Sequence, residues 1–561
     1  MNKKFTMSLL TLALVTSITY AKDSTKDNTN TKATDLHLYT DTNVTTLGVE
    51  EAAKLKEYQG KFPRPQFQTA VPEYKEAWDK ISNNKIPEWI IDAKFGIYTH
   101  WGVYSIPGFA DNTYVRYMYD KRNPRGVYQH HLENYGKPEE YGYTKFVEQF
   151  TAEDYNAKDM LELMIDSGAK FGGLGTVHHD GFLMWDSEIN RWNAGKMGPK
   201  RDLYGEFVTE ARKRDFKVAA SFHHARTWDL VHKSIDETSF SAEEKSKLDI
   251  YNPEYEDFYV GRHSTKTTVD VFAQQWHDKI IEVIDKYSPD FFFFDGIERT
   301  KPNSPENLVV DALDYYYENA KKQGKEVVVA NKLPGNKIFN FPEHIGIPTY
   351  EGGRDMPADV GGYFLVDRAI SYPWTYVKNK VYNLNANYHI DALMDMVARG
   401  GIYLLSLTPM ASGAIDPKEE AIFREIGQWL KVNGEAIYDT RRWTIPAEGP
   451  VSTWTVSKRG RAGHESTRMN WSYKKVKDGE IRFTQKDGQL YAMSLTWPKS
   501  GEILIKSLNL DSQYYPQGIN KVSLLGYGEL EFTRTKAGLK VTLPKQKPSA
   551  IYNHGVSFKI G

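Results

Sequence analysis

The chain has 561 residues, enough for two or more domains with sizeable cores. Its 72 Lys and Arg residues nearly balance 73 Asp and Glu residues, so the charge pattern gives no reason to expect binding to nucleic acid or to an anionic membrane. The absence of cysteine excludes disulfides, thiol lipidation and cysteine-ligated metal. Aromatic residues make up 13 %, which mildly favours a sugar-binding surface because flat rings cover sugar faces.

The N-terminus is typical of an export signal. Residues 1–4 form a short basic region, residues 5–18 are mostly apolar, and the stretch ends at the small residue Ala21. The apolar run is too short and wrongly flanked for a membrane anchor, so we expect a signal peptide over residues 1–21. Residues 22–45 are polar and rich in Asn and Thr, which predicts a disordered leader. These features predict a protein that is secreted or periplasmic in a bacterium.

Strand-like and helix-like segments then alternate over some 350 residues. We expect strands over residues 94–102, 169–181, 217–222, 290–295, 326–330, 345–350 and 401–406. Helical spacing occurs over residues 154–167, 203–215, 271–287, 306–323 and 390–399. This alternation predicts an α/β fold, a (β/α)8-like TIM barrel that forms a catalytic domain over residues 46–440.

The remaining residues, 441–561, have a different pattern. Short alternating segments are separated by Gly, Asp, Lys and Pro turns, for example over residues 479–484, 490–495 and 557–560. Such spacing predicts a C-terminal antiparallel β-sandwich appended to the barrel.

The most informative stretch is residues 288–299, where four consecutive phenylalanines precede Asp295 and Gly296. An apolar run of this kind predicts a strand buried on both faces. An acid at the C-terminal end of a barrel strand lies where such folds place their chemistry. The alternative is that Asp295 only caps the following turn.

Other predicted strands also end in polar side chains. Because the C-terminal ends of barrel strands meet on one face, these side chains are expected to converge there. The set comprises His100, His178, His179, His223, His224, Asp295, Asn331 and Glu351. One such residue is usually structural, but several together with two acids indicate a functional site.

Three chemistries could use this set. Metal-assisted hydrolysis is disfavoured because consecutive strand residues face opposite sides, so each adjacent histidine pair offers at most one inward ligand. We therefore expect no metal. Glycoside hydrolysis by Asp295 and Glu351 fits a rim rich in histidine and aromatic side chains. A sugar-binding protein without catalysis would need the pocket but not both acids.

The sequence contains five ordered blocks that resemble the α-L-fucosidases of glycoside hydrolase family twenty-nine. The blocks are Ala93–Ser105, Val177–Phe182 with Trp185–Ser187, Gly198–Leu203, Tyr287–Gly296 and Ile426–Tyr438. The resemblance covers roughly residues 85–561. It implies a retaining, exo-acting hydrolase with a barrel and a C-terminal sandwich, and it implies no metal or organic cofactor.

The resemblance also implies roles for individual residues. Asp295 corresponds to the nucleophile, and His100, His178 and His179 correspond to residues that hold ring hydroxyls, with Trp101 nearby. His223 belongs to a strand end that lines the substrate. Phe293 is a candidate for the apolar wall that the C6 methyl group of fucose requires.

The position of the acid/base varies within the family, so the resemblance does not identify it. The candidates are therefore chosen from the acidic residues of this chain. Glu351 is the first candidate because it ends a strand, and the alternative is a turn residue exposed to solvent. Glu298 is the second candidate and Asp367 the third. A useful acid/base should be partly buried near Asp295, which raises its pKa.

The sequence departs from the family at three places. Asn112-Thr113 stands where the family commonly has Glu-Trp, Phe293 stands where it has Trp, and Tyr403 and Ser406 stand where it favours Asn. The Asn112-Thr113 departure motivates two alternatives, an α-L-galactosidase or a fucosidase for modified, for example sulfated, fucose. An alternative of another class is a catalytically weak fucose-binding protein.

The expected function is therefore hydrolysis of terminal α-L-fucosyl residues by double displacement. The expected partner is a fucosylated oligosaccharide or polysaccharide, with no nucleic acid and no membrane span. The sequence carries no indication of the oligomeric state.

Overall fold

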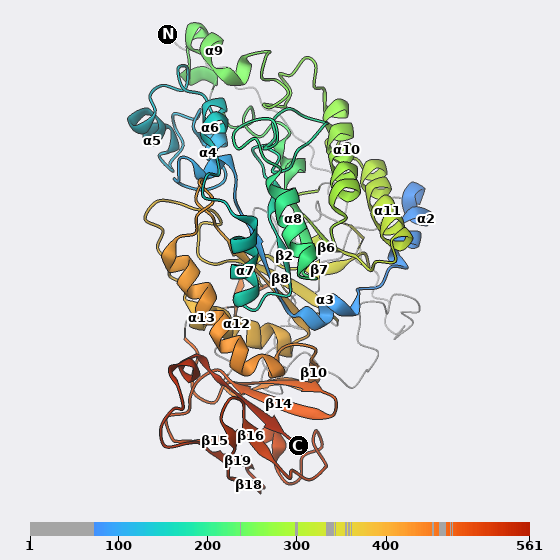
Figure 1. Ribbon diagram of the computed structural model, residues 1–561, viewed down its shortest axis with the longest axis vertical. Coiled ribbons are helices and arrows are strands. Elements are labelled where there is room, and N and C mark those ends of the chain that lie inside the picture. Colours follow the sequence, from blue (N-terminus) through green and yellow to red (C-terminus); the bar gives the residue numbers. More distant parts are fainter. Residues whose placement is uncertain are drawn as a thin grey trace, which may run out of the picture.

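The computed structural model describes residues 72–235, 237–297, 301–332, 341–342, 344–353, 356, 360, 362–450, 454–458, 467–471, 473 and 475–561. The predicted signal peptide, the predicted leader and Glu298 lie outside the described residues. The described chain forms a barrel domain above a smaller C-terminal β domain (Figure 1).

The barrel wall consists of eight parallel strands. In ring order the strands are β2 (Phe171–Gly173), β1 (Phe95–Thr99), β9 (Gly401–Leu407), β8 (Phe364–Ala369), β7 (Ile347–Thr349), β6 (Val328–Lys332), β5 (Phe291–Phe294) and β4 (Lys217–Phe222). β2 also pairs with β4, which closes the ring. The predicted barrel is thus confirmed.

Two details of the predicted strands differ from the structure. The segment expected over residues 169–181 is divided into β2 and a second short strand, β3 (Gly175–Val177), which pairs with β4. β8 was not predicted, because its apolar run is interrupted by Asp367-Arg368 and so lacks the pattern of a buried strand.

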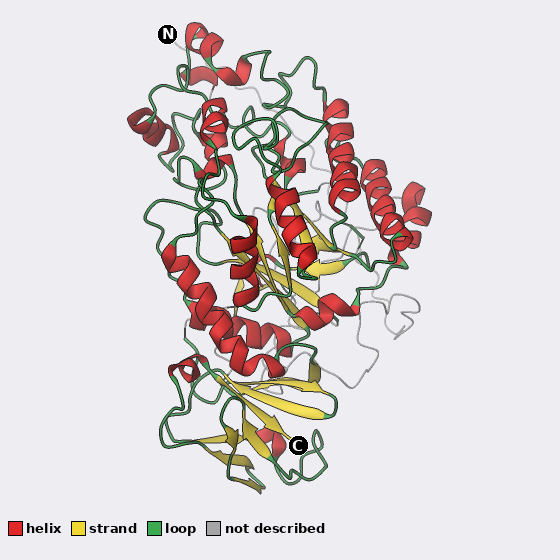
Figure 2. Cartoon of the chain, viewed as in Figure 1, coloured by secondary structure: helices red, strands yellow, loops and turns green. Residues whose placement is uncertain are grey.

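Helices surround the barrel strands (Figure 2). The longer ones are α7 (Ala157–Asp166), α8 (Leu203–Lys213), α10 (Val269–Tyr287), α11 (Glu306–Lys322), α12 (Ala386–Ala398) and α13 (Pro417–Asn433). The shorter ones are α2 (Lys75–Ser82), α3 (Glu88–Ala93), α4 (Tyr114–Tyr117), α5 (Val127–Asn134), α6 (Thr144–Gln149) and α9 (Ala242–Lys247). In the described part of the chain, no helix combines the length and apolar character that crossing a membrane requires.

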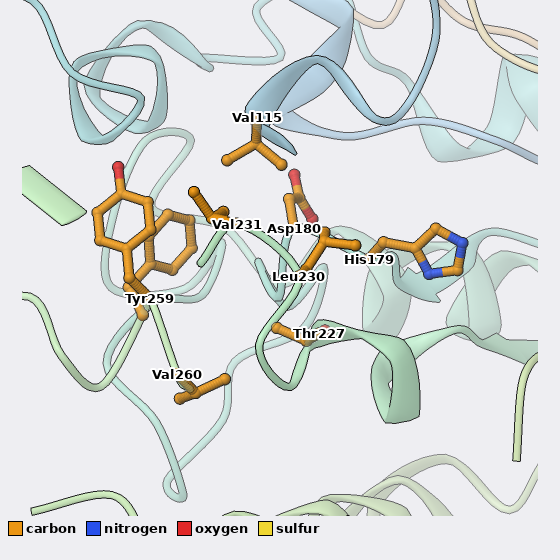
Figure 3. A pocket seen from close by; sticks show the side chains of 9 residues that line it. Val115, His179, Asp180, Thr227, Leu230, Val231, Tyr259 and Val260 are labelled. Carbon is orange, nitrogen blue, oxygen red and sulfur yellow. The ribbon is translucent and has the colours of Figure 1, made fainter. Parts of the chain in front are cut away.

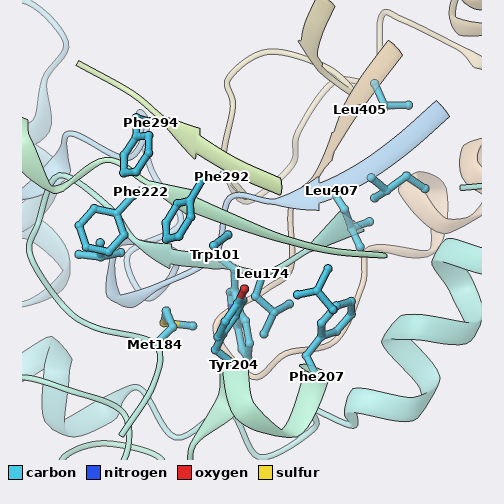
Figure 4. Packing of buried hydrophobic residues seen from close by; sticks show 14 of the residues in the cluster. Trp101, Leu174, Met184, Tyr204, Phe207, Phe222, Phe292, Phe294, Leu405 and Leu407 are labelled. Carbon is cyan, nitrogen blue, oxygen red and sulfur yellow. The ribbon is translucent and has the colours of Figure 1, made fainter. Parts of the chain in front are cut away.

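The four phenylalanines of β5 divide between the two sides of the barrel wall. Phe291 and Phe293 belong to the small core inside the barrel, together with Tyr98 and Leu404. Phe292 and Phe294 belong to the larger core between strands and helices, and their rings stack with centroids 4.8 Å apart (Figure 4). This alternation confirms a strand buried on both faces.

The C-terminal domain contains two main antiparallel sheets. One has the order β10 (Arg441–Glu448), β13 (Ile481–Lys486), β14 (Gln489–Ser494), β20 (Val556–Ile560), β16 (Val522–Leu524) and β17 (Gly528–Glu529). The other has the order β15 (Glu502–Ile505), β19 (Gly538–Thr542) and β18 (Phe532–Thr535), and β11 (Trp454–Lys458) forms a hairpin with β12 (Thr467–Trp471). A separate apolar core joins the two main sheets. The predicted sandwich is confirmed.

Candidate active site

Strand alternation directs a ring of polar side chains toward the C-terminal opening of the barrel. In each case a residue two positions earlier on the same strand faces the barrel interior, so the polar residue also faces inward. The pairs are Tyr98 and His100 after β1, Ser221 and His223 after β4, Phe293 and Asp295 after β5, Ala330 and Lys332 on β6, and Leu404 and Ser406 on β9. These strand ends therefore converge, whereas the expected Asn331 and His224 do not face the site.

Asp295 is buried and held by two donors. Lys332 Nζ donates to Oδ1 at 2.8 Å, and His223 Nδ1 donates to Oδ2 at 3.2 Å. Burial alone would raise the pKa of Asp295, but the charges of Lys332 and Arg226 and the hydrogen bond from His223 hold it well below its usual value. Asp295 is thus an oriented, ionised carboxylate, which is a role beyond capping a turn.

Lys332 links the two predicted acids. Its Nζ also lies 3.1 Å from Glu351 Oε2, in the turn after β7. Because Nζ is 2.8 Å from Asp295 Oδ1, the two carboxylate oxygens are at most about 6 Å apart, near the spacing of retaining glycosidases and below that of inverting ones. The side chain of Glu351 is 33 % exposed and that of Asp295 is 8 % exposed, so Glu351 is the acid more open to solvent.

Lys332 was not among the predicted site residues, although its strand end was. The neighbouring tip, Asn331, was expected to face the site. Instead its Nδ2 donates to the carbonyls of Pro342 and Ile345, at 2.9 and 3.0 Å, which is a structural role. Strand alternation could have identified Lys332. Val328 and Ala330 face the barrel interior, and residues two positions apart on a strand face the same side, so Lys332 also faces inward.

Four histidines near Asp295 are neutral. Burial is the main cause that lowers the pKa of His100, His178, His179 and His223, and for His179 the value falls to about 3. Neutral imidazole has one donor and one acceptor nitrogen, which suits it to hydroxyl groups. The site therefore combines the ionised carboxylate of Asp295 with uncharged imidazole rings that can donate and accept hydrogen bonds.

Hydrogen bonds assign the tautomers of two of these rings. His223 donates from Nδ1 to Asp295, so its Nε2 accepts from Ser221 Oγ at 2.8 Å. His179 donates from Nδ1 to the carbonyl of His223 at 3.1 Å, so its Nε2 carries a lone pair 3.8 Å from Asp295 Oδ2. His179 Nε2 and Asp295 Oδ2 are thus both acceptors, and a hydroxyl group placed next to them could donate a hydrogen bond to either one.

His178 and His179 both face the site, which corrects the expectation that only one of them would. The ring of His178 stacks on His223 with centroids 4.3 Å apart, while His179 lies beside Asp295. The alternation rule fails here because β3 ends at Val177, before the pair. It holds for the second pair, since His224 turns away from the site and contacts Lys279 on α10 at 2.9 Å.

Two departures from the family pattern contact the histidines directly. Ser406 Oγ lies 2.7 Å from His100 Nδ1. The amide nitrogen of Asn112 lies 3.1 Å from His178 Nε2, while Nδ1 of the same ring accepts from the amide of His179. Because Nδ1 accepts, Nε2 of His178 carries the hydrogen and needs an acceptor. The side-chain amide of Asn112 is therefore best assigned with its oxygen, not its nitrogen, facing His178 Nε2. Asn112 and Ser406 thus orient the rings of His178 and His100.

The predicted aromatic contacts have different outcomes. Trp101 packs in the core against Phe150 and Tyr155, at 5.4 and 5.0 Å, and is not brought among the histidines (Figure 4). Phe293 lies one layer below Asp295 as part of the floor, 1 % exposed. Sequence reasoning missed Trp374, which lies 5.1 Å from the His100 ring and is partly exposed.

Asp367, the third acid/base candidate, lies below the site. It faces inward on β8, is 1 % exposed, and neither carboxylate oxygen has a hydrogen-bond partner among the described residues. Burial, opposed by the charge of Lys332, raises the pKa of Asp367 to about 6. Its almost complete burial makes it a poor candidate for direct contact with a leaving group.

Two sets of these side chains could hold a metal ion by distance alone. They are His100, His178 and His223, and His179, His223 and Asp295, with ligand atoms within 4.8 Å of one another in each set. The second set shares its carboxylate with Lys332, and the charge of Arg226 also acts on it, so two cations already oppose a dication there.

A small cavity lies behind the site rather than in it. Its lining includes Asp180, Leu230, Val231 and Val260, and the imidazole of His179 points away from it (Figure 3). Burial raises the pKa of Asp180 to about 6, and Tyr143 donates to this carboxylate at 2.9 Å. The lining is mostly apolar, and this cavity is not part of the site around Asp295.

A closed parallel barrel with paired carboxylates and neutral imidazoles at its C-terminal opening defines a glycoside hydrolase. The family model for α-L-fucosidase matches residues 64–435, and the model for the α-L-fucosidase C-terminal domain matches residues 474–561. The chain belongs to the α-L-fucosidase family.

Individual relatives are consistent with this membership. Tissue α-L-fucosidase of Mus musculus is 27 % identical over 481 residues, covering 84 % of this chain and 91 % of the relative. Plasma α-L-fucosidase of Rattus norvegicus is 28 % identical over 482 residues, covering 84 % and 90 %. The crystal structure of Thermotoga maritima α-fucosidase in complex with fucose shares the fold, with a TM-score of 0.63, 23 % identity, and coverage of 86 % and 99 %.

Proposed function

We propose that this α-L-fucosidase is a retaining exo-enzyme that releases terminal α-L-fucosyl residues from oligosaccharides or polysaccharides. The observation that carries the proposal is the Lys332 ammonium, which contacts both Asp295 and Glu351 and so keeps the two carboxylates close. A retaining mechanism needs this spacing, because one carboxylate must reach the anomeric carbon while the other reaches the departing oxygen.

The two acids divide the chemistry. Asp295 is the nucleophile, since it is ionised and fixed by His223 and Lys332. It attacks the anomeric carbon while Glu351 gives a proton to the leaving oxygen, which breaks the glycosidic bond and leaves a fucosyl ester on Asp295. Glu351, now a carboxylate, takes a proton from water, and the resulting attack releases fucose and restores both acids.

The neutral rings hold the sugar. His100, His178, His179 and His223 present uncharged nitrogens around Asp295. The acceptor nitrogen of His179 faces Asp295 across a gap of 3.8 Å and receives a ring hydroxyl. Phe293 forms the floor below, and Trp374 provides a partly exposed apolar surface beside His100 for the methyl group. Trp101 supports the strand end from the core.

Substitution of each acid tests this assignment. Asp295→Asn is expected to lower kcat by at least about 10³-fold with an unchanged circular dichroism spectrum, because the nucleophile is lost. Glu351→Ala is expected to lose most activity, with azide restoring turnover of an activated aryl fucoside as fucosyl azide. Near-normal turnover by Asp295→Asn, or no azide effect on Glu351→Ala, would contradict the respective role.

The contact between Asn112 and His178 favours substrates other than unmodified fucose as a second possibility. Asn112 stands beside His178, where the family commonly has a glutamate, so one negative charge is absent from the sugar pocket. A neutral amide tolerates an anionic or bulkier sugar better than a carboxylate does. We therefore propose sulfated fucose or α-L-galactose as alternatives. Initial rates on aryl α-L-fucoside, aryl α-L-galactoside and sulfated fucoside decide among them.

Export is proposed from the N-terminal sequence. The basic, apolar and small-residue order of residues 1–21 has the pattern of a cleaved signal peptide. N-terminal sequencing of the protein recovered outside the cytoplasm of an expressing bacterium is expected to begin near Lys22. An intact Met1 on the mature protein would contradict export.

A further inference from the structure

The turn that carries Glu351 depends on contacts from outside itself. Glu351–Gly353 form a short 3-10 turn after β7 in which Gly352 and Gly353 have φ of 63° and 68°. Glycine occupies this left-handed region freely, so two in succession do not fix the turn by themselves. The amide of Gly353 donates to the carbonyl of Tyr350 at 3.2 Å, and the carbonyl of Gly352 accepts from Arg368.

Arg368 is a buried cation placed behind this turn. It is 5 % exposed and near the end of β8, and its guanidinium donates to the Gly352 carbonyl and to the Tyr388 hydroxyl of α12. Both hydrogen-bond acceptors of Arg368 within the described part of the chain are therefore uncharged, and neither is a carboxylate. A charge-assisted hydrogen bond in a buried place is strong, so it fixes the Gly352 peptide next to Glu351.

The C-terminal domain supports Arg368 through aromatic rings. Tyr388 packs edge to face on Tyr473, with centroids 5.5 Å apart, and the Tyr473 hydroxyl donates to Asp395 of α12 at 2.9 Å. Asp395 also binds Arg482 of β13. The backbone of the C-terminal hairpin strand β12 lies beside the Glu351–Gly353 turn. The turn is thus held between barrel and C-terminal domain.

We propose that Arg368 is a positioning residue for proton transfer by Glu351, and that the C-terminal domain takes part in this positioning through Tyr473. The inference rests on the proposed acid/base role of Glu351. It assigns a catalytic contribution to the C-terminal domain through Tyr473, whose contacts lead to the Glu351–Gly353 turn by way of Tyr388 and Arg368. Loss of Arg368 leaves Asp295 and its donors in place but releases the Gly352 peptide.

The test compares two leaving groups. Full-length Arg368→Met, Arg368→Lys and Tyr473→Phe are assayed for kcat/KM on 4-nitrophenyl and phenyl α-L-fucosides. Phenol leaves poorly without a proton, and general acid catalysis contributes about 10²–10⁴-fold, so misplacing Glu351 affects the phenyl substrate more. Arg368→Met is expected to lose at least about tenfold more on the phenyl fucoside, Tyr473→Phe about threefold more, and Arg368→Lys less than Arg368→Met.

Two control variants distinguish a positioning role for Arg368 from a general effect on the fold. Tyr552→Phe removes another buried hydroxyl of the C-terminal domain, which donates to the Leu525 carbonyl at 2.9 Å, and is expected to affect both substrates equally. Glu351→Gln is expected to show the largest leaving-group dependence. If it shows none, the acid/base assignment is refuted and the inference with it. If it does, but Arg368→Met and Tyr473→Phe lower both rates equally or not at all, only the inference is overturned.

Discussion

The ionisation of Asp295 is set by opposing effects that individual residues supply. Burial favours the neutral acid, whereas Lys332, Arg226 and His223 favour the carboxylate and prevail, so the pKa lies well below the usual value. The folded-state pKa is depressed, so this group stabilises the protein above the ordinary pKa of about 4 and loses that contribution as pH falls further. Asp295 therefore stays ionised throughout the mildly acidic range.

Removing the charge of Lys332 is expected to raise the pKa of Asp295, because burial is then less opposed. Activity requires the carboxylate, so the acid limb of kcat/KM for Lys332→Met should move to higher pH, with at least about tenfold loss near pH 5. Lys332→Arg keeps the charge and should shift the limb less. An unchanged acid limb in Lys332→Met would show that another cation controls Asp295.

Asp367 is expected to reduce stability at neutral pH. Its pKa is raised from 3.8 to about 6 by burial, so its charged form costs stability as pH rises through that interval. Asp367→Asn should therefore raise the free energy of unfolding by on the order of 1–3 kcal/mol more at pH 7.5 than at pH 4.5. Thermal unfolding at the two pH values measures this difference. An equal effect at both would refute a buried, titrating Asp367.

At the scale of elements, β2 shows how closely the barrel wall is packed. This strand of three residues pairs with both β1 and β4. A Cβ atom added to Gly172 would lie 1.9 Å from the Ile97 carbonyl oxygen, and one added to Gly173 would lie 2.0 Å from that of Ala219. Only glycine permits this approach, so the strand cannot accept a side chain without moving backbone.

Gly172→Ala is expected to destabilise the protein by at least about 3 kcal/mol or to prevent soluble expression, because the clash is with main chain. Gly518→Ala is the matched control, since no atom lies within 4 Å of an added Cβ there. Chemical denaturation of both variants measures the contrast. Similar stabilities of the two variants would contradict the closed pairing of β2.

The sequence predicted most elements and part of the site, and the failures have physical causes. β5 was predictable because four phenylalanines can only be buried on both faces. β8 was not predictable, because Asp367-Arg368 interrupts the apolar run of a strand that is nevertheless buried. The inward direction of Lys332 and Ser406 can be predicted from strand alternation once one inward residue of each strand is known. The positions of Trp374 and Asn112 could not be predicted, because both residues lie on loops whose course depends on tertiary contacts.

At the scale of the whole molecule, the apolar core around the barrel extends into the C-terminal domain, which also has a separate core of its own. Tyr473, Tyr491 and Met493 belong to the same apolar cluster as the barrel helices. Arg482 of β13 binds Asp395 of α12, and both side chains are fully buried. Breaking such a pair leaves an uncompensated buried charge, so the two domains are not expected to separate before they unfold.

Thermal unfolding is therefore expected to show a single calorimetric transition for both domains. Arg482→Ala should lower its midpoint without dividing it, because the shared apolar cluster remains. Differential scanning calorimetry measures this directly. Two separable transitions in the wild-type protein would contradict a shared core.

Covalent trapping tests the role of Asp295 most directly. A 2-fluoro-fucosyl fluoride slows release of the intermediate, so the enzyme should accumulate one fluorofucosyl group per chain. Peptide mapping by mass spectrometry should place that group on Asp295, and Asp295→Asn should remain unlabelled. Labelling of a different carboxylate, or hydrolysis with inverted anomeric configuration by NMR, would contradict the mechanism.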